Sequence, residues 1–192
     1  MEAICSMAVN RPDLSKRYTF SDMETWEEPE RFELIDGTPF LLASPGVEHE
    51  DVSTQLRTVF NEYVRRNRPE CRVYGDPAGI LLDEGERNVV RPDLFVVCQP
   101  MIKNGQMLGV PLFIVEILSK STASYDVHVK YRLYERYGIR EYWVVDPLHQ
   151  LVQVYHLNQK EYEFAGQFSK EDVIETKVFE DFGVRLGEIF LL

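Results

Sequence analysis

The chain has 192 residues and a formal net charge of −11, and 44% of its residues are hydrophobic and 12% aromatic. This composition is typical of a folded globular domain and excludes a largely disordered chain. The acidic balance argues against tight, nonspecific nucleic-acid binding, because phosphate contacts need clustered Lys and Arg. We expect an arm over residues 1–18 and a single domain over residues 19–192.

The sequence predicts neither a secretory leader nor a membrane partner. The apolar start of the chain is short and interrupted by polar residues, and no apolar run approaches spanning length. The three cysteines, Cys5, Cys71 and Cys98, include no C-x-x-C pair, which disfavours a disulfide framework or a zinc site. We therefore expect a cytoplasmic protein.

The first half of the chain predicts two helices and a hairpin. Residues 19–28 predict a short helix, and residues 31–44 predict a hairpin whose turn is Asp36-Gly37. A long helix is expected over residues 47–67. Its apolar face recurs at spacings of three and four residues and comprises Val52, Leu56, Val59, Phe60 and Val64.

Basic residues gather near the end of this long helix: Arg65, Arg66 and Arg68, with Arg57 and Arg72 nearby. Positive charges suit a solvated helix C-terminus, where the helix dipole favours cations. A local basic patch of this kind is also compatible with nucleic-acid binding by an otherwise acidic protein.

Strands are predicted next. Residues 71–75, 79–83 and 93–98 are short apolar segments separated by polar turns. The nearly continuous apolar run at residues 112–119 is typical of a strand that is buried on both faces.

The second half of the chain predicts a crossover followed by a hairpin. A helix over residues 123–137, stopped by Gly138, leads to another buried strand at residues 141–146. This order predicts a right-handed crossover. Residues 151–157 and 161–166 predict a second hairpin, and the remaining residues are expected to wrap the edge of the sheet. The expected fold class is α/β (α+β), with a mixed central sheet flanked by helices.

Glu116 interrupts the apolar strand predicted at residues 112–119. It shares a strand face with Ile114 and Leu118, and the intervening residues point the other way. An unpaired carboxylate in such a strand is costly. A bound cation or a basic partner offsets the cost; the alternatives are a structural ion pair and a strand end that reaches solvent.

Asp93 follows Pro92 at the start of another predicted strand. Taken alone, an Asp after Pro is a common turn residue. Asp93 and Glu116 both border apolar segments that can pair in one sheet, however, and two neighbouring carboxylates repel each other unless a cation lies between them. Their oxygen atoms suit Mg²⁺, which binds one or two carboxylates and keeps several waters.

Lys130 belongs to the predicted helix over residues 123–137. Its helix face also holds Val127, Tyr131, Tyr134 and Tyr137, and we expect this face to lie against the sheet. Lysines usually avoid such a position. The alternative to a functional role is snorkelling, in which the stem is packed and the ammonium reaches water.

Several segments together resemble the Uma family of restriction-endonuclease-like proteins: "RFELIDG", "RPDLFVV", "VEILSKSTASYD", the Lys130-x-x-x-Tyr134 pattern and "YGIREYWVVDP". The similarity extends from about Phe20 to the closing "GEIF", and the order and spacing of the segments are distinctive. That family belongs to the PD-(D/E)XK superfamily. The resemblance therefore implies a restriction-endonuclease-like fold and a metal-dependent nuclease.

The resemblance also assigns roles to residues. Pro92-Asp93 corresponds to the PD element and Glu116 to the acid of the (D/E)XK element, so Asp93 and Glu116 are expected to bind Mg²⁺ or Mn²⁺. Leu118 stands where the superfamily has a Lys.

The missing lysine is expected to come from the following helix. By the resemblance, Lys130 orients or polarises the attacking water, and Lys120 is a weaker candidate.

Two further residues, Glu33 and His49, are candidates for support of the site. Glu33, within "FELIDG", is expected either to complete the metal shell or to pair with an Arg. His49, at the start of the long helix, would bind the scissile phosphate or a water, or else lie on the surface. Ser119 and Thr122 are expected to cap the helix that carries Lys130.

The sequence thus predicts an endonuclease that hydrolyses phosphodiester bonds of DNA, with a homodimer as a further expected partner. The alternative from another class is a catalytically degenerate nuclease fold that serves as a binding or oligomerisation module. An enzyme that acts on RNA or branched DNA is a third hypothesis, because a fold does not select a substrate.

Overall fold

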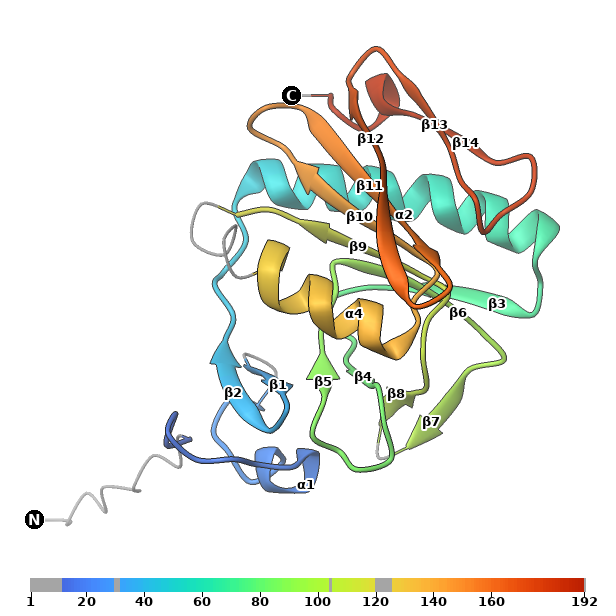
Figure 1. Ribbon diagram of the computed structural model, residues 1–192. Coiled ribbons are helices and arrows are strands. Elements are labelled where there is room, and N and C mark those ends of the chain that lie inside the picture. Colours follow the sequence, from blue (N-terminus) through green and yellow to red (C-terminus); the bar gives the residue numbers. More distant parts are fainter. Residues whose placement is uncertain (1–11, 30–31, 104, 120–125, 192) are drawn as a thin grey trace, which may run out of the picture.

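The computed structural model describes residues 12–29, 32–103, 105–119 and 126–191. Within these residues, the strands form two six-stranded sheets and a separate two-stranded hairpin (Figure 1). Among the described residues, no helix has both the length and the apolar character that a bilayer span requires.

The larger sheet, here called the central sheet, carries the longest strands. They are β3 (Cys71–Tyr74), β6 (Leu94–Cys98), β9 (Phe113–Ile117), β10 (Glu141–Asp146), β11 (Leu151–Asn158) and β12 (Glu161–Ser169). Their order is β12-β11-β10-β9-β6-β3, and β9 and β10 are parallel while the other neighbours are antiparallel. This arrangement confirms the predicted mixed sheet and the β11–β12 hairpin. It also confirms that the strands before and after the helix in the chain, β9 and β10, are parallel neighbours.

The second sheet consists of short strands and includes the β1–β2 and β7–β8 hairpins. They are β1 (Phe32–Ile35), β2 (Thr38–Leu41), β4 (Ile80–Leu81), β5 (Val89–Val90), β7 (Met101–Lys103) and β8 (Gln106–Leu108). The predicted β1–β2 turn is confirmed, because Asp36 and Gly37 have positive φ angles of 50° and 77°. The sequence did not predict β5, β7 and β8, because two or three residues carry no measurable periodicity.

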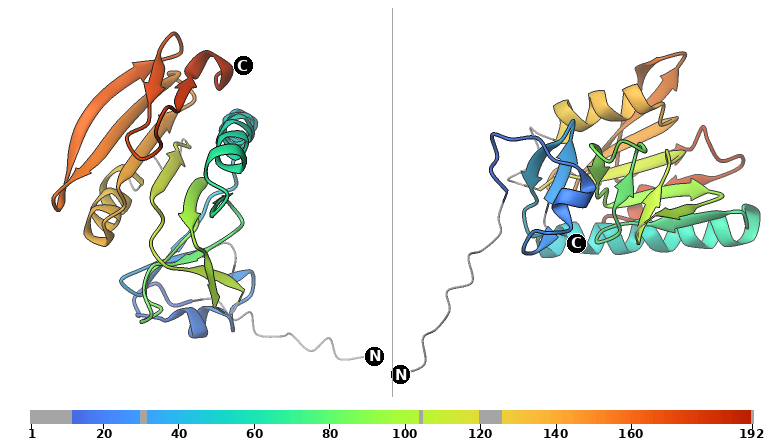
Figure 2. Two further views of the ribbon diagram at one scale, coloured as in Figure 1. Left: turned by 90° about the vertical axis from the view of Figure 1, so that its right-hand side faces the viewer. Right: turned by 90° about the horizontal axis from the view of Figure 1, so that it is seen from below.

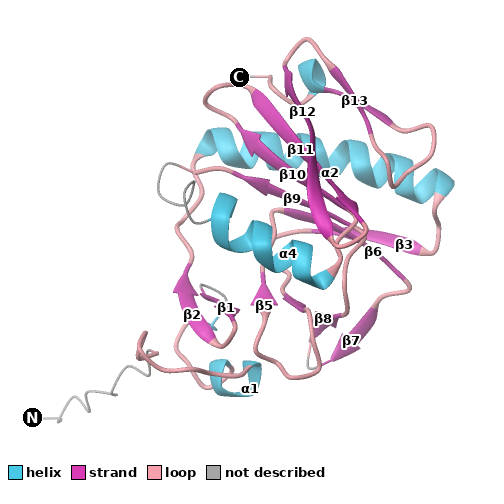
Figure 3. Cartoon of the chain, in the orientation of Figure 1, coloured by secondary structure: helices cyan, strands magenta, loops and turns pink. Residues whose placement is uncertain are grey.

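Two helices lie on opposite faces of the central sheet (Figures 1 and 2). On one face, α2 (Val47–Asn67) has the predicted bounds and buries its apolar stripe against Leu94, Val96 and Val115. On the other face, α4 (Tyr131–Tyr137) belongs to the cluster that contains Phe95 and Ile114. Figure 3 shows these helices and the strands between them by secondary structure. Because successive side chains of a strand point to opposite faces, the strands separate the two apolar layers.

The helix predicted over residues 123–137 is described from residue 126 onward. It begins as a π-helix, η2 (Asp126–Lys130), and continues directly into α4. Gly138, with a φ angle of 79°, ends it as predicted.

The first helix is shorter than predicted. Only α1 (Phe20–Met23) forms, with Thr19 and Asp22 in a capping box. The Thr25 hydroxyl donates to the Asp22 carbonyl at 2.7 Å, and such side-chain bonds compete with continued helix. Trp26 then turns into a small core against Phe32.

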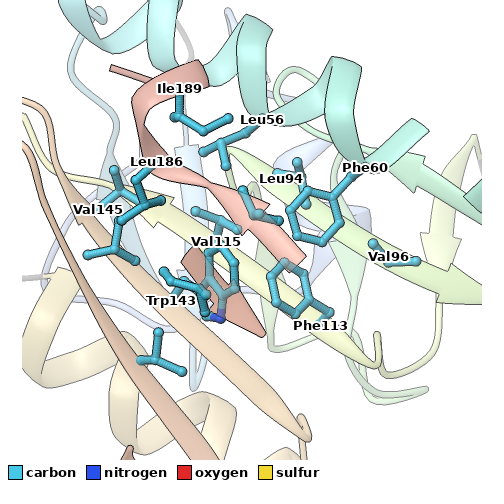
Figure 4. Packing of buried hydrophobic residues seen from close by; sticks show 14 of the residues in the cluster. Leu56, Phe60, Leu94, Val96, Phe113, Val115, Trp143, Val145, Leu186 and Ile189 are labelled. Carbon is cyan, nitrogen blue, oxygen red and sulfur yellow. The ribbon is translucent and has the colours of Figure 1, made fainter. Parts of the chain in front are cut away.

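The C-terminal residues cover a face of the central sheet, so the expectation that they wrap its edge is wrong. They form β13 (Val173–Glu175), β14 (Gly183–Arg185) and the 3₁₀-helix η3 (Leu186–Glu188). Leu186 and Ile189 join Leu56 of α2 above Trp143 and Val145 (Figure 4). A single helix leaves part of this wide apolar face uncovered, and the C-terminal residues bury the rest.

Cys71 and Cys98 form a disulfide between directly paired residues of β3 and β6. The cysteine spacing gave no indication of this bond, because it depends on strand register rather than on a sequence motif. The expectation against disulfides is therefore corrected at this pair.

Candidate active site

The predicted site residues meet where β6 begins, β9 ends and α2 begins. A cavity of about 230 Å³ lies at this point. Its charged and ionisable lining residues come from β9, from the segments that follow β3 and β5, and from α2 and η2, and they include His49, Arg57, Asp76, Arg91, Asp93, Glu116 and Lys130.

Asp93 lies in the segment that links β5 of the second sheet to β6 of the central sheet. The antiparallel register between β6 and β9 places it opposite Glu116. Its Oδ2 accepts the backbone N–H of Ile117 at 2.7 Å, and its Oδ1 lies 3.0 Å from His49 Nε2. Two neighbours from different elements thus fix the orientation of this carboxylate.

Glu116 is buried, with 3% of its surface exposed, and it lies on the sheet face that α4 covers. Its Oε1 accepts hydrogen bonds from Lys130 Nζ at 3.0 Å and from the Tyr134 hydroxyl at 2.5 Å. The carboxylate that interrupts the apolar strand therefore has a basic partner, and it does not reach solvent at a strand end.

Lys130 does not snorkel, because only 2% of its side chain is exposed. Its Nζ lies 3.0 Å from Glu116 Oε1 and 3.1 Å from Glu33 Oε1. Glu33 is fully buried in β1, and its Oε1 also accepts the Arg91 backbone N–H at 2.6 Å. Glu33 therefore contacts Lys130 through an ion pair and Arg91 through a backbone hydrogen bond, and its expected place in a metal shell stays a prediction.

The buried group of Glu33, Glu116 and Lys130 contains two acids and one amine. Burial of ionised groups is costly unless they are paired and hydrogen-bonded, and Arg91, which is also buried, lies beside Glu33 as a further cation. Burial, followed by the charges of Glu116 and Glu33, raises the pKa of Tyr134 well above its usual value. The Tyr134 hydroxyl therefore stays protonated as a donor to Glu116.

His49 lies beside Asp93 and is mostly buried rather than a surface residue. Burial alone lowers the pKa of His49, but the hydrogen bond and the charge of Asp93 outweigh it, so the net shift is upward. Burial and the charge of Asp93 in turn raise the pKa of Asp76.

Sequence reasoning missed Asp76, Arg91 and Arg57 as lining residues of this cavity, and it missed the buried Tyr134 as a partner of Glu116. One signal was available. Gly75 ends a predicted strand, and a Cβ there would lie 2.1 Å from the Asp93 carbonyl oxygen, which makes this glycine a mark of close backbone approach. Ser119 lines the cavity, whereas Lys120 and Thr122 lie outside the described residues.

The acids of the cavity fit a hard divalent cation by their chemistry. Asp93 and Glu116 supply carboxylate oxygens from two paired strands beside an open volume, and Mg²⁺ is bound in proteins by one or two carboxylates plus waters. Among the residues that the structure describes, the tight three-ligand group lies elsewhere, at Glu70, Cys71 and Cys98, and its cysteines are joined in the disulfide.

Comparison with known families identifies the chain. The family described as "Uma2: Putative restriction endonuclease" matches residues 19–187. The chain belongs to the Uma2 family. This confirms the resemblance drawn from the sequence segments and assigns this Uma2 protein to a nuclease-like family.

Two relatives support the assignment. The "Uncharacterized protein slr1290" of Synechocystis sp. is 28% identical over 156 residues, which cover 79% of this chain and 80% of the relative. A crystal structure from Anabaena variabilis, described as "a putative nuclease belonging to DUF820", has a TM-score of 0.72 and 21% identity and covers 90% of this chain and 97% of that one. The second comparison shows the fold alone, and it confirms the expected nuclease-like α+β class.

Proposed function

We propose that this Uma2 protein is a metal-dependent endonuclease that hydrolyses phosphodiester bonds of DNA. The observation that carries the proposal is the meeting of Asp93, Glu116 and Lys130 at one cavity, with Lys130 Nζ 3.0 Å from Glu116 Oε1. Two acids from paired strands and an amine from the next helix are the groups that a phosphodiesterase site of this type needs.

Asp93 and Glu116 hold a Mg²⁺ or Mn²⁺ ion in this proposal. When bound, the ion lowers the pKa of a water ligand and neutralises charge on the phosphoryl oxygens. The Ile117 N–H and His49 keep the Asp93 carboxylate in place, and the Tyr134 hydroxyl does the same for Glu116. Both carboxylates are therefore oriented before substrate arrives, so little reorganisation is needed during the reaction.

Lys130 acts on the reacting atoms. Its ammonium, held between Glu33 and Glu116, donates a hydrogen bond to the attacking water or to a nonbridging phosphoryl oxygen. A fixed donor in a water-poor site stabilises the charge that develops in the transition state. Glu33 does not touch the substrate in this scheme; it positions Lys130.

A cleavage assay with supercoiled, linear and single-stranded DNA tests the proposal. Asp93→Asn and Glu116→Gln should each reduce Mn²⁺-dependent cleavage by about 100-fold or more, because each removes one charged ligand. Circular dichroism shows whether the variants remain folded, and Glu161→Gln, on the exposed start of β12, is the matched control.

Two results contradict the proposal. One is cleavage that persists in chelator; the other is undiminished cleavage by the folded Asp93→Asn and Glu116→Gln variants. Calorimetry with Mn²⁺ separates the alternatives, because a catalytically degenerate module need not bind metal through these acids. Metal binding without DNA cleavage would instead direct the assay to RNA or branched substrates.

Cleavage of both DNA strands generally requires two active sites. We therefore propose a homodimer as the cutting unit. Light scattering of the full chain, with and without duplex DNA, measures its mass, and a monomer under both conditions would contradict this part of the proposal.

A further inference from the structure

Arg57 is separate from the basic cluster with which the sequence grouped it. It lies near the middle of α2 and lines the cavity together with His49 and Asp93. Arg65 and Arg66, in contrast, are exposed in the last turn of the same helix. Two arginine environments therefore occur on one helix, and only Arg57 belongs to the candidate active site.

The Nε of Arg57 is buried and lacks a hydrogen-bond partner among the described residues, and the charge of Arg57 acts on Asp76, which lines the same cavity. A Cβ at Gly75 would lie 3.0 Å from this Nε, so the arginine passes close to the backbone that faces Asp93. A buried donor of this kind is costly unless something else supplies an acceptor.

Other buried polar atoms without a hydrogen-bond partner lie on the same side of α2 as Arg57. His49, Ser53 and Arg57 follow at intervals of four residues, so they lie on one side of the helix. Ser53 is only 1% exposed. Its Oγ and the Nδ1 of His49 are also buried and have no hydrogen-bond partner among the described residues. Three neighbouring polar groups on this side of the helix therefore lack hydrogen-bond partners among the described residues, and the Arg57 Nε–H is the one that can only donate.

The other buried cations at the cavity are already engaged. Lys130 is held by Glu33 and Glu116. Arg91 donates to two backbone carbonyls, those of Phe32 at 3.2 Å and Pro77 at 2.5 Å. Arg57 thus differs from both in what its side chain can still bind.

We infer that Arg57 binds a phosphate of the nucleic-acid strand that enters the cavity. This inference rests on the proposed function and names a substrate contact for it. A guanidinium offers paired N–H groups that match two phosphate oxygens, and it remains charged at any working pH. From its place beside Asp93, Arg57 holds the strand against the acids that receive the scissile group.

Binding of a fluorescein-labelled DNA oligonucleotide to the full chain tests the inference, with Ca²⁺ in place of Mg²⁺ and fluorescence anisotropy as the measurement. Arg57→Ala should weaken the affinity by about tenfold or more, as expected for loss of a charge-assisted hydrogen bond. Arg57→Lys should recover part of the affinity, because it keeps the charge but lacks the planar fork. The dependence of affinity on salt should fall by about one phosphate contact in Arg57→Ala.

Arg66→Ala is the matched control, because it removes the same residue type from an exposed position on the same helix. Its affinity should remain within about twofold of the parent. Equal affinity in Arg57→Ala and the parent, equal losses in Arg57→Ala and Arg66→Ala, or no oligonucleotide binding by the parent would each overturn the inference.

The failure of this inference can be distinguished from failure of the proposed function. Mn²⁺ binding reports on the metal site. The Mn²⁺ affinity should fall in Asp93→Asn and should equal that of the parent in Arg57→Ala. If the parent cuts DNA while Arg57→Ala binds it normally, the endonuclease stands and the role of Arg57 is refuted. If the parent binds the oligonucleotide through Arg57 but cuts nothing, the phosphate contact is supported and the proposed activity fails.

Discussion

The ammonium of Lys130 lies 3.0 Å from Glu116 Oε1, and both side chains are almost completely shielded from water. One residue comes from the end of a π-helix and the other from a strand in the middle of the central sheet. Their pairing therefore joins two layers of the molecule at the point where we propose that hydrolysis occurs. It has a structural role and a chemical role that can be separated by experiment.

Replacing Lys130 by Met should lower the free energy of unfolding by about 3–5 kcal/mol, because it leaves buried acids without their cation. DNA cleavage should also be lost. Urea unfolding measures the first effect, and the cleavage assay below the unfolding transition measures the second. Lys160→Met, at an exposed position, should change neither quantity. Unchanged stability of the Lys130→Met protein would show that the ion pair does not contribute to folding.

The raised pKa of His49 predicts how stability depends on pH in the presence of a chelator. A folded histidine that binds its proton more tightly than the unfolded one contributes stability below its unfolded pKa, about 6.5, and loses that contribution as the pH rises through its folded pKa. The free energy of unfolding should thus fall more steeply from about pH 6 to 8 in the parent than in His49→Gln. Parallel profiles would contradict the proposed coupling to Asp93.

A methyl group at Gly75 should displace the Asp93 backbone, because its Cβ would lie 2.1 Å from the Asp93 carbonyl oxygen. We expect Gly75→Ala to destabilise the fold by about 1–3 kcal/mol and to weaken Mn²⁺ binding. Denaturation and calorimetry measure these effects. Gly187→Ala is a suitable control, since its nearest contact would be an ordinary 3.4 Å. Normal metal affinity in Gly75→Ala would mean that Asp93 tolerates the shift.

Glu141 ties the C-terminal residues to the central sheet. Its fully buried carboxylate accepts the Trp143 indole N–H at 2.8 Å and the backbone N–H groups of Lys177 and Val178 at 2.8 and 3.1 Å. Glu141→Gln should cost about 2 kcal/mol, because an amide group then faces N–H donors.

Hydrogen exchange should locate that effect in the C-terminal residues 173–190, while metal binding at the distant cavity remains unchanged. Faster exchange throughout the chain, or reduced Mn²⁺ affinity, would contradict a local role for Glu141.

The predictable part of the fold is the part with regular periodicity. The stripe of α2 and the apolar run of β9 extend over enough residues to identify them without tertiary information. The strands of the second sheet are short, and the disulfide depends on the register of β3 against β6. Neither feature leaves a local pattern in the sequence.

The candidate site also has a part that the sequence predicted and a part that it did not. The family resemblance selected Asp93, Glu116 and Lys130, and the structure brings them to one cavity. Tyr134 was assigned only to a buried helix face, and Arg57 only to a basic cluster. The contact of Tyr134 with Glu116 and the place of Arg57 at the cavity follow from how α4 and α2 pack on the sheet, which no spacing within either helix reveals.

The short segment from Val90 to Leu94 connects β5 of the second sheet to β6 of the central sheet. The angle between the two sheets therefore sets the position of the Asp93 carboxylate. Loop-length changes in the β7–β8 hairpin should leave catalytic geometry intact, because that hairpin lies at the far edge of the second sheet. A single residue inserted between Asp93 and Leu94 would instead turn the carboxylate to the opposite side of the sheet, toward α2's apolar layer. Changes of length are therefore tolerated in the β7–β8 hairpin, whereas the segment from Val90 to Leu94 must keep its length.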